Sequence, residues 1–141
     1  MEATLQNPVP ATARTTPKGR SIVYWTVTAL FCLEMGFTAC YMLLRLPEGA
    51  QAFVRLGFAG YFRVELALAK LIGVAVLLVP APARLKEWAY AGFAINLFSA
   101  LIAHLSLGDG PGSVSPSAST SVLWALSYFF WRRLPETRSS L

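Results

Sequence analysis

Two charged side chains lie deep inside long apolar stretches of this chain. Glu34 is near the centre of residues 22–44, and Lys70 is near the centre of residues 61–79. In an apolar environment such a group must face other protein, pair with an opposite charge, or lose its own charge. If the two stretches form antiparallel neighbouring helices, these residues fall at similar depth, and we expect Glu34 to pair with Lys70. Two roles stay open for Glu34, a proton-carrying or ligand-binding carboxyl and a structural one. For Lys70, a structural ion pair is favoured over a base or a ligand for an acidic head group.

Further polar side chains lie on the faces of these helices. Tyr41 continues the face of Glu34 toward one end of the helix, with Thr38 and Arg45 on the same face. Arg63 is seven residues before Lys70 on one face, whereas Glu65 is about 140° away from Lys70 around the helix. Asn96 lies among small residues, a pattern that favours helix packing with one polar hydrogen bond.

His104 is the only histidine, and Asp109 follows it by five residues. If the helices alternate in direction, both lie at the end that also holds Tyr41, Arg63 and Glu65, so a polar mouth leading toward Glu34 and Lys70 is expected. His104, with Asp109 near it, is expected to be the proton-exchanging group at this mouth. The alternative is that His104 contacts the carbonyl groups at the end of its helix. The spacing of His, Cys and carboxylates predicts no metal site. Cys32 and Cys40 are expected to pack as small apolar residues.

The composition indicates a membrane protein. Of the 141 residues, 55% are hydrophobic and only 13% are charged, and the mean hydropathy is +0.53. Soluble domains carry about a quarter charged residues. The large apolar side chains and the two cysteines also exclude intrinsic disorder and a disulfide scaffold.

Four apolar segments divide the chain. Residues 1–21 are expected to be a disordered tail, residues 22–133 a helical membrane domain, and residues 134–141 a second tail. The predicted spans are residues 22–44, 61–79, 88–107 and a fourth that begins between residues 117 and 122 and ends at residue 131. The first three are long enough to cross a hydrocarbon layer of about 30 Å at about 1.5 Å per residue. The connection at residues 47–60 is expected to lie on the membrane surface, and residues 84–87 are expected to form a short turn.

The fourth span is short, because residues 108–121 are rich in Gly, Pro and Ser and are expected to form a loop. A surface or re-entrant helix is the alternative to a fourth crossing. With four crossings, one side receives the following eight basic residues: Arg14, Lys18, Arg20, Arg84, Lys86, Arg132, Arg133 and Arg138. The other side receives three, Arg45, Arg55 and Arg63. The positive-inside rule then predicts an all-α, integral membrane four-helix bundle with both termini cytoplasmic. This distribution also explains the net charge of +5 without a nucleic-acid partner.

Several stretches in order resemble the DoxX-like family of small four-helix bacterial membrane proteins. They are GFAGYF at residues 57–62, AKLIG at 69–73, LLVP at 77–80, RLKEWAYAG at 84–92 and HLSLGD at 104–109. The resemblance covers roughly residues 24–133. It implies the four-crossing topology in a bacterial inner membrane, and Lys70, His104 and Asp109 match the patterns of the family. The family takes its name from a membrane subunit of a thiosulfate:quinone oxidoreductase, but the resemblance assigns no activity.

Three functions are compatible with these observations. The leading hypothesis is binding of a small hydrophobic or quinone-like molecule in a polar-lined cavity of the bundle, within a larger membrane redox assembly of several subunits. The second is acid–base catalysis on a lipophilic substrate (isomerisation, cyclisation or epoxide opening), with Glu34 or His104 as the acid. The third is a structural accessory subunit. Ligand contacts are assigned to Lys70, Asp109, Tyr41, Arg63, Glu65 and Asn96, and no cofactor is identified.

Overall fold

A computed structural model describes residues 17–44, 51 and 53–134 of the chain. Its long helices are α1 (Pro17–Leu43), α3 (Gly60–Leu78), α4 (Ala83–Ser106) and α5 (Pro111–Arg132). A short helical segment at residues 53–55 precedes α3, and the described residues include no strand. The all-α fold class predicted from the sequence is therefore confirmed.

The ends of α3 agree with the predicted span to within one residue, whereas two other helices begin earlier than predicted. α1 begins at Pro17, five residues before the apolar stretch, and α4 begins at Ala83. The prediction of a turn at residues 84–87 was thus wrong. Pro80 and Pro82 stop α3, and a proline just before a helix favours an early start, because it fixes φ and needs no N–H partner.

The predicted loop at residues 108–121 is also wrong for most of its length. α5 begins at Pro111 and runs for 22 residues, so it is about 33 Å long at a rise of about 1.5 Å per residue. The hydroxyls of Ser119, Thr120 and Ser121 bond back to carbonyl oxygens of their own helix, the last of them to Ser117 at 2.7 Å. These bonds satisfy the hydroxyls without water, which lets a serine-rich sequence remain helical.

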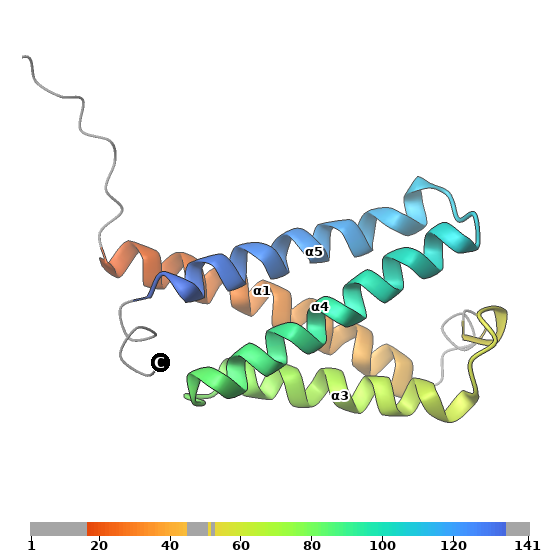
Figure 1. The fold of residues 1–141 in the computed structure, drawn as a ribbon, viewed down its shortest axis with the longest axis horizontal. Coiled ribbons are helices and arrows are strands. Elements are labelled where there is room, and N and C mark those ends of the chain that lie inside the picture. Colours follow the sequence, from red (N-terminus) through yellow and green to blue (C-terminus); the bar gives the residue numbers. More distant parts are fainter. Residues whose placement is uncertain (1–16, 45–50, 52, 135–141) are drawn as a thin grey trace, which may run out of the picture.

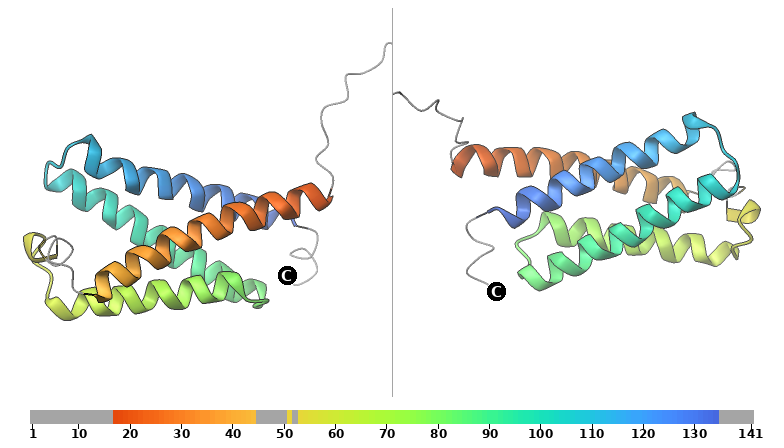
Figure 2. Two further views of the ribbon diagram at one scale, coloured as in Figure 1. Left: turned by 180° about the vertical axis from the view of Figure 1, so that it is seen from behind. Right: turned by 45° about the horizontal axis from the view of Figure 1, so that its top comes forward.

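The four long helices lie side by side, and neighbours in the cyclic order α1, α3, α4, α5 form the main contacts between them (Figures 1 and 2). The start of α1 and the end of α5 lie at the same end of the molecule, as does the turn between α3 and α4. From that turn α3 and α4 separate toward the opposite end (Figure 1).

The buried side chains of α1 and α4 meet in the middle of the helices. Phe31 is fully buried, and its ring packs edge-to-face on Phe93 with centroids 5.0 Å apart. The remaining core consists of Tyr24, Cys32, Met35, Leu77, Tyr90, Leu97 and Trp131. The expectation that Cys32 packs as an apolar residue agrees with its burial, whereas Cys40 is exposed.

A large part of the outer surface is apolar. Leu33, Phe37, Trp88 and Ile95 are each at least 70% exposed. A soluble monomer rarely exposes a continuous apolar surface of more than a few hundred Å². Two helices, over Lys18–Leu43 and Ala83–Ser106, are long and apolar enough to cross a membrane, and only 28% and 17% of their most apolar windows are buried. The core helix of a soluble protein would be mostly buried, so these outward-facing side chains suit a lipid environment.

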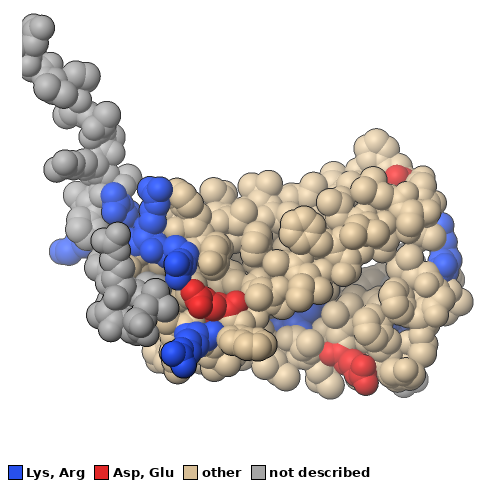
Figure 3. Space-filling model, viewed as in Figure 1, with Lys and Arg blue, Asp and Glu red and all other residues tan. Residues whose placement is uncertain are grey.

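Charged side chains concentrate at the ends of the molecule. Figure 3 shows most of the basic side chains of this face at the end that holds the start of α1 and the end of α5. Arg132 and Glu87 form an ion pair there, 2.8 Å apart. The long sides of the helices between the two ends are mainly uncharged in this view.

Candidate functional site

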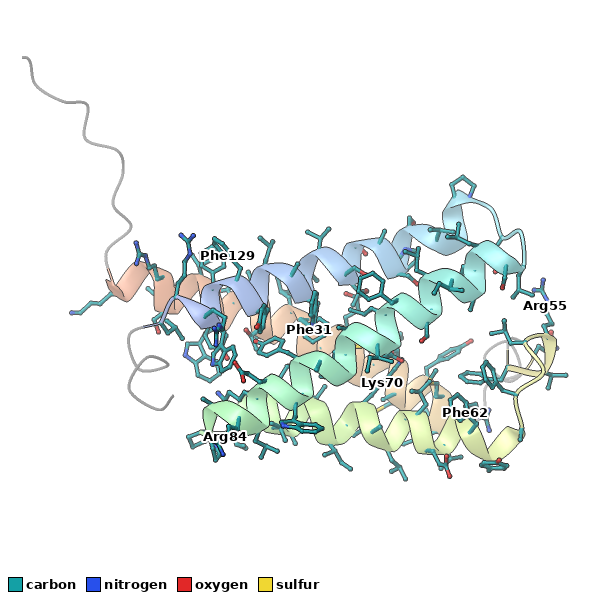
Figure 4. The ribbon with its side chains drawn as sticks, viewed as in Figure 1. Phe31, Arg55, Phe62, Lys70, Arg84 and Phe129 are labelled. Carbon is teal, nitrogen blue, oxygen red and sulfur yellow. The ribbon has the colours of Figure 1, made fainter. Side chains whose placement is uncertain are left out.

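A groove lies between α3 and α4. Its volume is about 270 Å³. In Figure 3 the surface between α3 and α4 is hollowed, with basic side chains at its base, and Figure 4 labels Lys70 in this region from the same direction. The groove is lined by Leu66, Ala69, Lys70, Ile72, Gly73, Val76, Leu85, Trp88, Ala89, Gly92, Phe93 and Asn96.

The shape of the groove follows from a few small and large residues. Gly73 lies so close to Phe93 that a Cβ atom there would come within 2.8 Å of two ring carbons. The two helices therefore meet closely at this point, and Phe93 is buried beneath the groove. A Cβ atom at Gly92 would meet no atom within 4 Å, so this side of the groove is open. Exposed Ile72 and Trp88 form the rim, and the groove thus opens on the apolar outer surface.

Lys70 and Asn96 are the polar residues of this lining. Lys70 is only 8% exposed, and its ammonium has no hydrogen bond or ion pair in the described part of the chain. Asn96 is half-buried, and its amide has no partner among residues 53–134 or 17–44 either. The hydrogen bond expected for Asn96 in a packing seam is therefore absent. The buried residues of α4 are instead Lys86, Tyr90, Phe93 and Leu97.

The expected pair between Glu34 and Lys70 is not formed, and this expectation was wrong. The half-buried Glu34 contacts α5, where its Oε1 lies 2.5 Å from Oγ1 of the buried Thr120. Fully buried Phe31, which packs on α4, fixes the rotation of α1 so that Glu34 lies beside α5 rather than α3. The argument from similar depth in two neighbouring helices left the direction around the helix undetermined.

The hydroxyl of Thr120 contacts two oxygen atoms. It donates to Oε1 of Glu34, and it is also 2.7 Å from the carbonyl oxygen of Pro116, which can only accept. One hydroxyl hydrogen can be shared between two acceptors in a three-centre bond. The alternative arrangement is that Thr120 donates to Pro116 and a protonated Glu34 donates to Thr120.

At the end opposite the start of α1 and the end of α5, His104 and Asp109 are in contact, as the sequence suggested. Nδ1 of His104 is 2.9 Å from Oδ2 of Asp109, and Nη2 of Arg55 is 3.8 Å from the other carboxylate oxygen. Asp109 thus connects α4 to the segment before α3. The predicted role of His104 in proton exchange stays a prediction.

The remaining predicted residues of the polar mouth are not gathered into one site. Arg63 is 7% exposed, and its Nη1 is buried without a hydrogen-bond partner. Glu65 is exposed on another face of α3, and Tyr41 is half-buried on α1. The structure places Lys70 and Asn96 together in the groove, His104 with Asp109 at the helix ends, and Glu34 against α5.

Sequence reasoning missed a buried hydrogen-bonded cluster that joins three helices. Oγ of Ser127 lies 2.7 Å from Oγ1 of Thr28 and 2.7 Å from the hydroxyl of Tyr90. Nε1 of Trp124 donates to the backbone carbonyl of Tyr90 at 3.0 Å. The available signal was that Thr120 and Ser127 lie seven residues apart on one face of α5. Assigning the serine-rich segment to a loop concealed this face.

The arrangement offers no cluster of metal ligands: within the described ranges, no three His, Cys, Asp or Glu side chains come close enough to hold an ion. It offers instead a small, largely apolar groove with two unpaired polar groups. Such a groove suits a ligand with an apolar body and a polar end.

Comparison with known proteins identifies one relationship. The chain matches the DoxX-like family over residues 26–127, which includes most of α1, all of α3 and α4 and most of α5. No curated protein and no solved structure matches it. Together with the two apolar helices, the match indicates a membrane protein. Because the matched region covers well over half of the sequence, the chain belongs to the DoxX-like family.

Proposed function

We propose that this protein binds a small lipophilic molecule in the groove between α3 and α4, with the ammonium of Lys70 holding its polar end. The observation that carries the proposal is a buried, unpaired Lys70 at a groove whose rim lies on the apolar outer surface. A ligand dissolved in the bilayer would enter sideways, between Ile72 and Trp88. Lys70 and Asn96 would supply the hydrogen bonds that orient it.

The size of the groove limits the ligand. A volume of about 270 Å³ is close to the lower end of the range for small-molecule sites, about 300–1,000 Å³. A ring or head group of quinone-like size fits, while a longer tail would lie along the exposed apolar side chains outside. A role in a membrane redox assembly would follow if the ligand is a quinone.

The proposal includes the topology. Four crossings of a bacterial inner membrane with both termini in the cytoplasm are supported by the common end of α1 and α5 and by the basic side chains there (Figure 3). The length of α5, 22 residues, supports a fourth crossing.

The proposal is tested by mass spectrometry of small molecules that co-purify with the gently solubilised protein. A leucine at Gly92 would fill the open side of the groove, so Gly92→Leu should lose the bound molecule. Gly36→Leu is the matched control, because Gly36 also has open space around it but lies on α1, outside the groove. Equal retention by both variants would contradict the proposal.

Acid–base catalysis on a lipophilic substrate is the second candidate, and the contact between Glu34 and Thr120 is compatible with it. A protonated carboxyl is the form that a general acid needs. Glu34 does not line the groove, however, so binding is the better supported function. Turnover of a lipophilic epoxide that Glu34→Gln abolishes, with groove binding intact, would reverse this preference.

A further inference from the structure

Two of the four buried side chains of α3 are cationic. The buried residues of this helix are Arg63, Ala67, Lys70 and Leu77, which form one stripe along the helix. Arg63 and Lys70 are two turns apart, about 10 Å along the axis. The residue between them is the small Ala67, so no large side chain of the stripe separates the two basic groups.

Neither cation is neutralised by the described part of the protein. Nη1 of Arg63 is buried without a partner, and the ammonium of Lys70 forms no ion pair. The acidic residues of that part are engaged or turned away: Glu34 contacts Thr120, Glu87 pairs with Arg132, Asp109 contacts His104 and Arg55, and Glu65 is exposed.

Two unpaired charges on one buried face are unfavourable in a medium of low polarity. An anion between them would remove this penalty, because arginine and lysine both form strong charge-assisted hydrogen bonds with carboxylate and phosphate oxygens. The position of Lys70 in a groove that opens on the apolar surface gives such an anion a route from the bilayer. A neutral head group would leave both charges uncompensated.

We infer that the ligand of the groove is an anionic amphiphile, with one carboxylate or phosphate head group held by Lys70 and Arg63 and an apolar body along α3 and α4. This inference rests on the proposed function and adds the charge of the ligand to it. Lys70 lines the groove and contacts the head group there, and Arg63, which is outside that lining, reaches the head group from two turns nearer the start of α3. Two sources share this chemistry, a free lipophilic acid and an acidic membrane lipid.

The test compares probes that differ only in the charge or kind of head group. The full-length protein in a neutral detergent is titrated with oleate, with oleyl alcohol and with dioleoyl phosphatidic acid, and binding is followed by the shift in unfolding temperature and by mass spectrometry. We expect an acidic probe to bind at least about tenfold more tightly than oleyl alcohol, about 1.4 kcal/mol. Stronger binding of oleate identifies a free acid as the source, and stronger binding of phosphatidic acid identifies a lipid.

Variants of Lys70 and Arg63 test whether these two residues cause the preference for an acidic probe. Lys70→Met should abolish the preference for the acidic probe, Arg63→Met should reduce it, and Arg63→Lys should keep most of it. Arg55→Gln is the control, because this arginine is exposed and contacts Asp109. The conservative Arg63→Lys change preserves the test if Arg63→Met fails to fold.

The outcomes separate the inference from the proposed function. Equal binding of oleate and oleyl alcohol, lost in Gly92→Leu, would overturn the anionic ligand and leave the groove as a site for neutral molecules. A preference for acid that persists in both Lys70→Met and Arg63→Met would also overturn it. Failure of every probe to bind, together with an empty protein after gentle purification, would overturn both.

Discussion

Two polar regions of this molecule differ in whether their hydrogen-bonding groups have partners. In the cluster of Thr28, Tyr90 and Ser127, three hydroxyls bond to one another and join α1, α4 and α5. At the groove between α3 and α4, Lys70 and Asn96 have no partner in the described chain. The first region has the properties of a structural contact, and the second is where we propose that a ligand binds.

The difference matters because a membrane protein offers little water to the polar groups between its helices. Without water, an unpaired polar group has no alternative partner, so a polar group that stays unpaired needs another explanation. The hydroxyl of Tyr24 is one exception near the cluster, since it is buried without a partner. It is neutral, however, whereas the unpaired groups of α3 are cationic and more costly to bury.

The largest loss of stability is expected from Ser127→Ala. This change leaves the buried hydroxyls of Thr28 and Tyr90 without their common partner, so the free energy of unfolding should fall by about 1–3 kcal/mol. Thermal unfolding in detergent measures the loss. Ser119→Ala is the control, because this exposed hydroxyl bonds only to the carbonyl of Pro116. If both changes have equal effects, the cluster is not a structural contact.

Alanine substitutions at two glycines test how the groove is built. Their effects on stability should be smaller than that of Ser127→Ala and opposite to each other in sign. Gly73→Ala should force the ring of Phe93 to move and lower the stability by about 1 kcal/mol. Gly92→Ala meets open space, and it should raise the stability by about 0.5 kcal/mol, because alanine is the better helix former. Unfolding temperatures that change in the same direction would contradict the close contact at Gly73.

The smallest effect is expected from Glu34→Gln. The amide of glutamine can donate to Oγ1 of Thr120 as a protonated carboxyl does, so the stability should change by less than one hydrogen bond, about 0.5–1.5 kcal/mol. Thermal unfolding measures the change, and a loss of stability larger than one hydrogen bond would contradict the prediction. Infrared difference spectra of the wild type and this variant separate the two arrangements at Thr120, because only donation by Glu34 requires a protonated carboxyl.

The sequence predicted the position of α3 better than the partners of the polar residues. α3 lies where its apolar stretch predicted it, with Lys70 near its middle, whereas Glu34 lies nearer the end of α1 than its start, because this helix begins earlier than predicted. The rotation of α1 depends on tertiary packing, here on Phe31 against Phe93, which no single segment encodes.

α5 illustrates a second limit of prediction from the sequence. Glycine, proline and serine at residues 108–121 are typical of a loop. In α5, hydroxyls such as that of Ser121 bond to carbonyls of the same helix, and Thr120 and Ser127 bond to other helices. These bonds require neighbours that composition alone does not supply, so the cluster and the partner of Glu34 were missed together.

The most direct test of the account is the combined effect of Lys70→Met on stability and on ligand retention. Methionine has a similar length and no charge, so in protein stripped of ligand the unfolding temperature should rise as an unpaired buried charge is removed. Retention of the co-purifying molecule should fall by at least about tenfold, about 1.4 kcal/mol of binding free energy. A lower unfolding temperature with unchanged retention would show that Lys70 stabilises the fold and would contradict its role as the ligand contact.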